Sequence, residues 1–154
     1  MLEWFENRIP PPLIMLATGL VMWGASRYLP MADLPSIVRF GLGGALIGLG
    51  LYLDGRGILA FRKAKTTINP IALDKASALV TTGVYRITRN PMYVGMASLL
   101  TAEAFLLSSA WLLIGPLLFV LYINLFQIGP EERMMQAKFG ESFSAYKARV
   151  KRWI

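Results

Sequence analysis

Two reactive residue types are missing from this chain of 154 residues, which contains no cysteine and no histidine. The absence of cysteine excludes disulfide-stabilised scaffolds and thiolate nucleophiles. The absence of histidine excludes an imidazole base and, together with the missing thiolates, zinc sites of the usual kind. We therefore expect no metal site and no chemistry that needs an imidazole or a thiolate.

Charge is also scarce, because only 16% of the residues are charged whereas 55% are hydrophobic, with a mean hydropathy of +0.50. This balance leaves too little surface charge for a typical soluble domain and indicates an integral membrane protein. The length suits a single domain over residues 1–154. The net charge of +7 would also suit nucleic acid, but the basic residues are grouped by membrane side, so we expect no nucleic-acid partner.

The apolar segments predict an all-α fold, an integral membrane helical bundle of about four transmembrane helices with C-terminal amphipathic helices. The expected spans cover about residues 11–29, 37–60, 92–107 and 110–128. The second span is rich in glycine, and Gly44 and Gly48 have the spacing that lets a neighbouring helix approach closely. Only Ser108 and Ser109 separate the last two spans, which should form an antiparallel hairpin.

The basic residues predict the orientation in the membrane. Fourteen of the 16 Lys and Arg residues lie in three places: Arg8, seven residues between 56 and 89, and six between 133 and 152. Four spans put all three places on one side, and positively charged segments stay in the cytoplasm. We therefore expect both termini, the loop 61–91 and the tail 129–154 to face the cytoplasm, in a bacterial-type inner membrane.

Residues 83–95 place Arg, Asn and Tyr side chains directly against the start of the third span. Pro91 suits the first helical position, because its φ is preset and it lacks an N–H that would be left unpaired there. In one interpretation Asn90 caps this helix and the nearby arginines reach lipid phosphates. In the other, the helix N-terminus and these donors bind a carboxylate, amino-acid or phosphate group, while Tyr85 and Tyr93 offer ring faces to a cation.

Glu131 and Glu132 follow the fourth span directly after Gly129 and Pro130. This break is expected to start a new helix, whose dipole the acids of the first turn would compensate. Adjacent helical residues diverge by about 100°, so we expect one glutamate to face a pocket and the other to pair with Arg133 or a loop arginine. Since these acids and the arginine motif bracket one hydrophobic hairpin, the two should meet at its open end.

Glu103 lies within the third span, where a carboxylate is costly and usually faces a partner or a cavity. A functional role is one interpretation. The alternatives are a structural pair with Arg27 or Arg39, or a protonated acid hydrogen-bonded across helices.

The tail 141–154 carries an apolar stripe at helical spacing, with basic residues largely off that stripe. The residues of the stripe are Phe143, Tyr146, Val150 and Trp153. This pattern predicts an amphipathic helix at the cytoplasmic interface, acting mainly as a membrane anchor. Gly140 is expected to end the preceding helix and turn the chain.

In this combination the residues resemble the isoprenylcysteine carboxyl methyltransferase and phospholipid methyltransferase superfamily of integral membrane enzymes. The matching elements are residues 79–86, residues 89–95, Glu131-Glu132, Phe139-Gly140, Tyr146, Val150 and Arg152-Trp153. The resemblance covers about residues 66–154, and it is the order and spacing of the elements that make it specific.

The resemblance implies S-adenosyl-L-methionine as methyl donor, bound in a cytoplasm-facing pocket, and a lipophilic acceptor that enters from the membrane lipids. It implies catalytic roles for Arg89 and Glu132. The residues implied to bind the cofactor are Gly83, Val84, Tyr85, Arg89, Asn90, Pro91, Tyr93, Gly95, Glu131 and Glu132. Many relatives have His where this chain has Asn90, so an imidazole role does not carry over.

The acceptor is open between two chemistries. A carboxylate needs no general base, which suits a chain without His and Cys, whereas an amine must first lose a proton. The tail pattern is closest to the carboxyl methyltransferases, so we expect carboxyl O-methylation of an isoprenoid-like or lipid-like substrate, with phospholipid amine N-methylation as the alternative. An alternative of another class is a non-catalytic scaffold or small transporter, which would rely on Glu103 and the glycine-rich second span.

Overall fold

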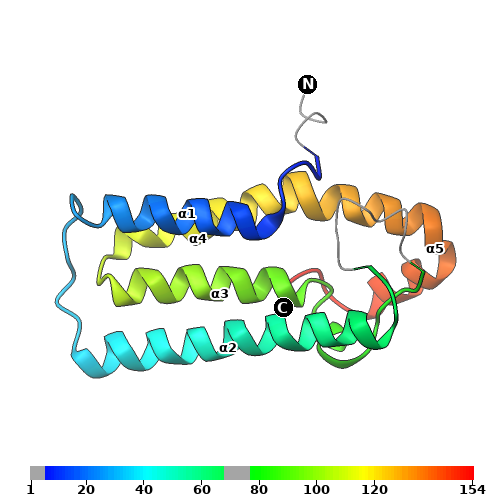
Figure 1. The fold of residues 1–154 in the computed structure, drawn as a ribbon, viewed down its shortest axis with the longest axis horizontal. Helices are drawn as coiled ribbons and strands as arrows, with labels where there is room; N and C mark the ends of the chain where they lie inside the picture. Colours follow the sequence, from blue (N-terminus) through cyan, green and yellow to red (C-terminus); the bar gives the residue numbers. More distant parts are fainter. Residues whose placement is uncertain (1–5, 68–76) are drawn as a thin grey trace.

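The computed structural model describes residues 6–67 and 77–154, and within them every regular element is helical, which confirms the all-α prediction. Figure 1 shows the helices of the bundle lying side by side along one direction, with α5 toward one end. These helices are α1 (Pro11–Ala25), α2 (Ser36–Lys63), α3 (Pro91–Leu106), α4 (Ile114–Ile123) and α5 (Gly129–Arg149). Two short 3-10 helices, η3 (Gly83–Arg86) and η4 (Ala110–Leu113), precede α3 and α4.

The helices differ in whether they are long enough to cross a membrane. Among the described residues, two helical runs are long and apolar enough to cross a membrane: α2, and the run Ala110–Arg149, whose charged part begins at Glu131. α1 and α3 are apolar but have 15 and 16 residues, and α1 ends at Ala25, before the expected limit at residue 29. Large apolar side chains such as Leu20 and Leu117 are exposed, as on a surface that faces lipid.

α2 packs along α3 through glycines spaced by seven residues, about two helical turns. The glycines that face α3 are Gly43, Gly50 and Gly57. A Cβ at Gly50 would lie 2.9 Å from the carbonyl oxygen of Gly95, so only glycine permits this approach. An added Cβ at Gly44 or Gly48 would meet no atom within 4 Å, so no described helix of this chain approaches closely at this pair.

Two hydrophobic clusters hold the bundle together. The first joins α1, α3 and α4 and includes Met22, Leu100, Phe119 and Ile123. The second joins α2, η3 and α3 and includes Leu53, Val84, Tyr85 and Val94. Trp153 packs against both clusters, so the C-terminal segment lies at their junction.

The helix does not break at Gly129 and Pro130, contrary to the expectation. A π-helical turn, η5 (Asn124–Ile128), precedes them, and the Gly129 N–H donates to the Asn124 carbonyl. Proline lacks an N–H and its ring clashes with the carbonyl of the previous α-helical turn, and the wider π turn accommodates this change. One helical run therefore continues from η4 into α5.

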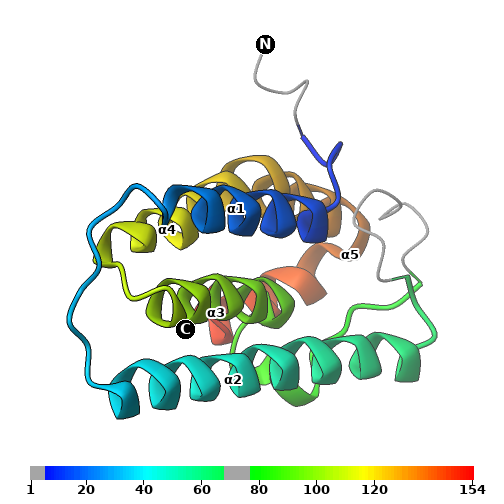
Figure 2. The same cartoon turned by 60° about the vertical axis from the view of Figure 1, so that its left-hand side comes forward.

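Gly140 turns the chain as expected. Its φ of 51° and ψ of −121° are not helical, and they lie within α5. Only glycine adopts such a conformation without strain. Figures 1 and 2 show the last part of α5 returning from this bend toward α3.

Candidate active site

The start of α3 and the start of α5 meet at the same end of the bundle, where a cavity of about 100 Å³ lies between them. This confirms that the arginine motif and the two acids converge. The polar residues that line the cavity are Thr67, Tyr85, Arg89, Asn90, Tyr93, Glu131, Glu132 and Tyr146. The apolar lining residues are Phe61, Leu79, Val80, Met92, Met135 and Phe143.

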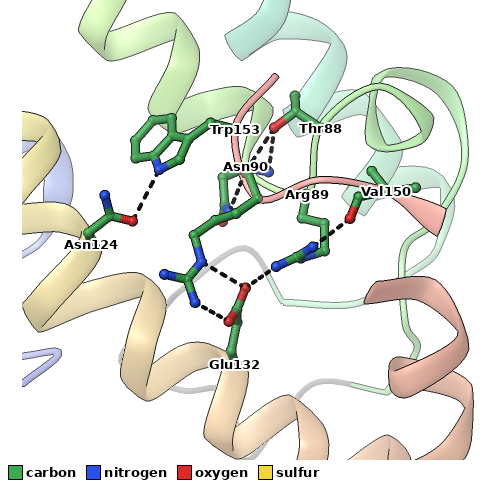
Figure 3. Close-up of polar contacts among 8 residues, drawn as sticks. Thr88, Arg89, Asn90, Asn124, Glu132, Val150 and Trp153 are labelled. Carbon is green, nitrogen blue, oxygen red and sulfur yellow. Dashed lines mark hydrogen bonds and ion pairs between the residues drawn. The ribbon is translucent and has the colours of Figure 1, made fainter. Parts of the chain in front are cut away.

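Glu132 is held by two arginines from different parts of the chain. Arg89 Nη2 donates to Oε1 at 2.6 Å, and Arg152 Nη2 donates to Oε2 at 2.5 Å. Figure 3 shows this carboxylate at the centre of the network, with Arg89 also donating to the Val150 carbonyl. Burial alone would raise the pKa of Glu132, but the hydrogen bonds and charges of Arg152 and Arg89 lower it below its usual value.

Glu131 has different partners, because both groups that bond to it are neutral. The Tyr93 hydroxyl donates to Oε1 at 2.6 Å, and Gln127 Nε2 donates to the same oxygen at 3.4 Å. Burial raises the pKa of Glu131 to about 7, more than these hydrogen bonds lower it. Both glutamates line the cavity, so the expectation that only one would face it was wrong, whereas the pairing with a loop arginine is confirmed.

The C-terminal segment is held by its backbone as well as by the Arg152 and Trp153 side chains. The Arg89 N–H donates to the Lys151 carbonyl at 2.9 Å, and Asn90 Nδ2 donates to the Arg152 carbonyl, also at 2.9 Å. Thr88 Oγ1 donates to the Arg152 carbonyl at 3.1 Å (Figure 3). Asn90 therefore does not cap α3 with its side chain, since that side chain bonds to the tail.

The tail departs from its expected role as a membrane anchor. The helix ends at Arg149 and Val150 is extended, so the apolar stripe is not one continuous helical face. Phe143 and Tyr146 are buried, and the Tyr146 hydroxyl donates to the Tyr85 carbonyl at 2.7 Å. The apolar stripe correctly indicated that Phe143 and Tyr146 are buried, but other parts of the protein cover them.

Six of the ten residues expected to bind a cofactor line the cavity, and four do not. Gly83 adopts a φ of 64° where η3 begins, Val84 is buried in a hydrophobic cluster and Pro91 begins α3. Gly95 packs against α2, where an added Cβ would lie 2.3 Å from Asp54 Oδ1. These four shape the backbone around the cavity without lining it.

Arg152 was matched only as part of a tail pattern, and its role as an ionic partner of Glu132 was not anticipated. Phe143 and Tyr146 were likewise not assigned to the cavity. Two features of the sequence could have assigned them to the cavity: their helical spacing and the glycine at position 140. The bend at Gly140 turns this stripe back toward the bundle.

Glu103 lies outside this site, near the other end of α3. It forms no ion pair with Arg27 or Arg39, so the expectation of that structural pair was wrong. Arg39 Nε instead donates to the Leu106 carbonyl at 2.8 Å, and the Arg27 guanidinium lies 4.2 Å from the centre of the Trp23 ring.

The sequence of this helical membrane bundle matches a known family over residues 38–142, which is most of the chain and includes both acids and the arginine motif. The chain belongs to the phospholipid methyltransferase family. The resemblance expected from the motifs is thereby confirmed, and the protein is a membrane methyltransferase. An uncharacterized protein of Haemophilus influenzae is 36% identical over 63 residues, which are 41% of this chain and the whole of that relative. No solved structure matches this member of the family.

Proposed function

We propose that this methyltransferase moves a methyl group from S-adenosyl-L-methionine to the amine of a membrane amphiphile. One observation supports an amine most directly. Glu131 is a buried cavity carboxylate bonded to neutral groups, while both guanidiniums near it are bound to Glu132. A buried carboxylate without an ionic partner favours a ligand that brings a positive charge.

The residues of the cavity fit this methyl donor. Arg89 Nε is buried without a hydrogen-bond partner among the described residues, and it suits the carboxylate of the donor's amino-acid part. The rings of Tyr85 and Tyr93 suit its positive sulfur. Apolar residues such as Leu79 and Phe143 suit its adenine ring. When bound, S-adenosyl-L-methionine supplies a methyl group as an electrophile on sulfur.

An amine acceptor must lose a proton before its lone pair can form the new carbon–nitrogen bond. Glu131 can take that proton, because a base with a pKa near the working pH is effective at neutral pH. The Tyr93 hydroxyl keeps the Glu131 carboxylate in one orientation through its hydrogen bond. In this proposal Glu132 has a positioning role, because it fixes Arg89 and the C-terminal segment.

A second candidate is carboxyl O-methylation, which the free Nε of Arg89 favours if it binds the acceptor rather than the donor. This reaction needs no general base, so it would not depend on deprotonation by Glu131. In either case we propose that the cavity faces the cytoplasm, because the basic segments lie at this end of the bundle.

The test combines calorimetry in detergent with transfer of a labelled methyl group from S-adenosyl-L-methionine to membrane lipids. The variants are Glu131→Gln and Arg89→Lys, with Glu141→Gln as the control, because Glu141 is exposed on α5. We expect at least tenfold weaker donor binding for Arg89→Lys and an unchanged control. Loss of the base in Glu131→Gln should slow transfer by about 100-fold or more.

Alkaline treatment of the labelled product separates the two candidates. An N-methyl group stays on the headgroup amine as non-volatile label even when the acyl esters are hydrolysed, whereas a methyl ester is released as volatile methanol. Saturable donor binding with an alkali-labile product would replace the amine proposal by the carboxyl one. No binding by the folded parent, in detergent and in lipid nanodiscs, would overturn both.

A further inference from the structure

A second hollow lies between α1 and α3, in the half of the bundle away from the cavity. Its volume is about 340 Å³, and it opens to the side of the helices. The lining residues that matter here are Leu16, Gly19, Leu20, Trp23, Leu100 and Glu103. Apart from Glu103 the groove is apolar, and Leu20 and Trp23 are exposed.

Glu103 is the feature of this groove that needs an explanation. It lies in the last turn of α3, about 5 Å along the axis from the helix end at Leu106. Its half-buried carboxylate has no hydrogen bond or ion pair with any residue that the structure describes. A Cβ at Gly19 would lie 2.9 Å from Glu103 Oε2, so the glycine of α1 leaves room for the carboxylate.

The arginines at this end cannot neutralise Glu103 without giving up other contacts. Arg39 donates to the Leu106 carbonyl, and Arg27 stacks on the ring of Trp23 at the rim of the groove. A carboxylate near lipid is costly without a cation or a hydrogen-bond donor. No ion pair with a described residue holds Glu103, so an amine that enters the groove would meet an unpaired carboxyl group.

We propose that this groove binds one phospholipid whose headgroup carries an amine. The amine pairs with Glu103, and an acyl chain lies along Leu16, Leu20 and Leu100. Glu103 is close enough to the helix end to lie near the headgroup region, where such an amine is found. Arg27, beside Trp23, provides a cation at the same rim for the phosphate.

This lipid site is separate from the proposed reaction site. Glu103 follows Pro91, the first residue of α3, by twelve positions, which is about 18 Å of helix. A second copy of the chain is a poorer occupant. It would need a free basic side chain at this depth, and Arg27 and Arg39 are both held against their own chain.

The absence of cysteine permits a probe of this groove alone. Leu20→Cys carries a bimane fluorophore in the groove, and Leu117→Cys carries it on α4 as a matched control, since these leucines are 68% and 64% exposed. Each labelled protein in detergent is titrated with phosphatidylethanolamine or phosphatidylglycerol with brominated chains, which quench bimane on contact. Each titration is repeated with Glu103→Gln.

We expect the groove probe to be quenched at about tenfold lower mole fraction of the amine lipid than of phosphatidylglycerol. Glu103→Gln should remove this preference, and the α4 probe should show none. Equal midpoints for the two lipids in the parent, or a preference that survives Glu103→Gln, would overturn the proposal. Protection of the groove probe that tracks a dimer in light scattering would assign the groove to a second copy instead.

Discussion

The two ends of the bundle treat similar side chains in opposite ways. At the cavity end, Glu132 is bonded to arginines 43 and 20 residues away in sequence, and the network closes around it. At the far end, Glu103 has two arginines on neighbouring segments but bonds to neither. At the far end Arg39 binds a backbone carbonyl and Arg27 contacts an aromatic ring, so an arginine on a neighbouring segment does not by itself predict an ion pair in this bundle.

The largest expected effect comes from breaking the closed end. Glu132→Ala leaves the Arg89 side chain, which is only 11% exposed, without its ionic partner. Removing one partner of a buried pair costs about 3–5 kcal/mol of unfolding free energy. Glu103→Ala removes no partner within the protein and should cost less than about 1 kcal/mol. Thermal unfolding in detergent measures both, and equal losses would contradict the contrast between the two ends.

A smaller effect concerns the pH dependence of stability at the cavity end. The pKa of Glu131 is raised from 4.5 to about 7, so the unfolded chain loses this proton at lower pH than the folded protein does. Stability from this group is therefore full below about pH 4.5 and is lost as the pH rises through 7, by up to about 3 kcal/mol.

Glu131→Gln removes this titration, so the stability of the parent relative to the variant should fall between pH 5 and pH 8. Chemical unfolding at several pH values measures the difference. The comparison with the parent cancels the opposite contribution of Glu132, whose pKa is lowered and whose stabilisation is lost at low pH. A difference that stays constant with pH would show that Glu131 does not titrate in this range.

The smallest of these expected effects on stability comes from adding a methyl group to a glycine where α2 and α3 pack together. Gly95→Ala would put a Cβ 2.3 Å from Asp54 Oδ1 and 2.9 Å from the Gly50 carbonyl, so we expect a loss of about 2 kcal/mol. Gly43→Ala meets only the side chain of Leu106, which can move, and should cost less. Gly48→Ala meets no atom within 4 Å and serves as the control. The unfolding midpoints of the three variants test this prediction, and the midpoint of Gly95→Ala should be the lowest and that of Gly48→Ala the highest.

The sequence allowed the helices and the meeting of the arginine motif with the two acids to be predicted, because hydrophobic runs and prolines mark helices locally. The docking of the tail could not be predicted, since Thr88, Arg89 and Asn90 bind backbone carbonyls, which every residue carries. The close helix approach expected at Gly44 and Gly48 is absent among the described residues of this chain for a related reason. The spacing of glycines says which residues share a face, but the facing helix decides which face is used.

The π-helical turn before Pro130 has a consequence for the register of α5. A π turn holds one residue more than an α turn, so it rotates everything after it by about 100° relative to an uninterrupted α-helix. The direction in which Glu131 meets Tyr93 therefore depends on that extra residue. In evolutionary terms, a single-residue insertion into an apolar helix is enough to turn a later carboxylate by about 100° toward a neighbouring helix.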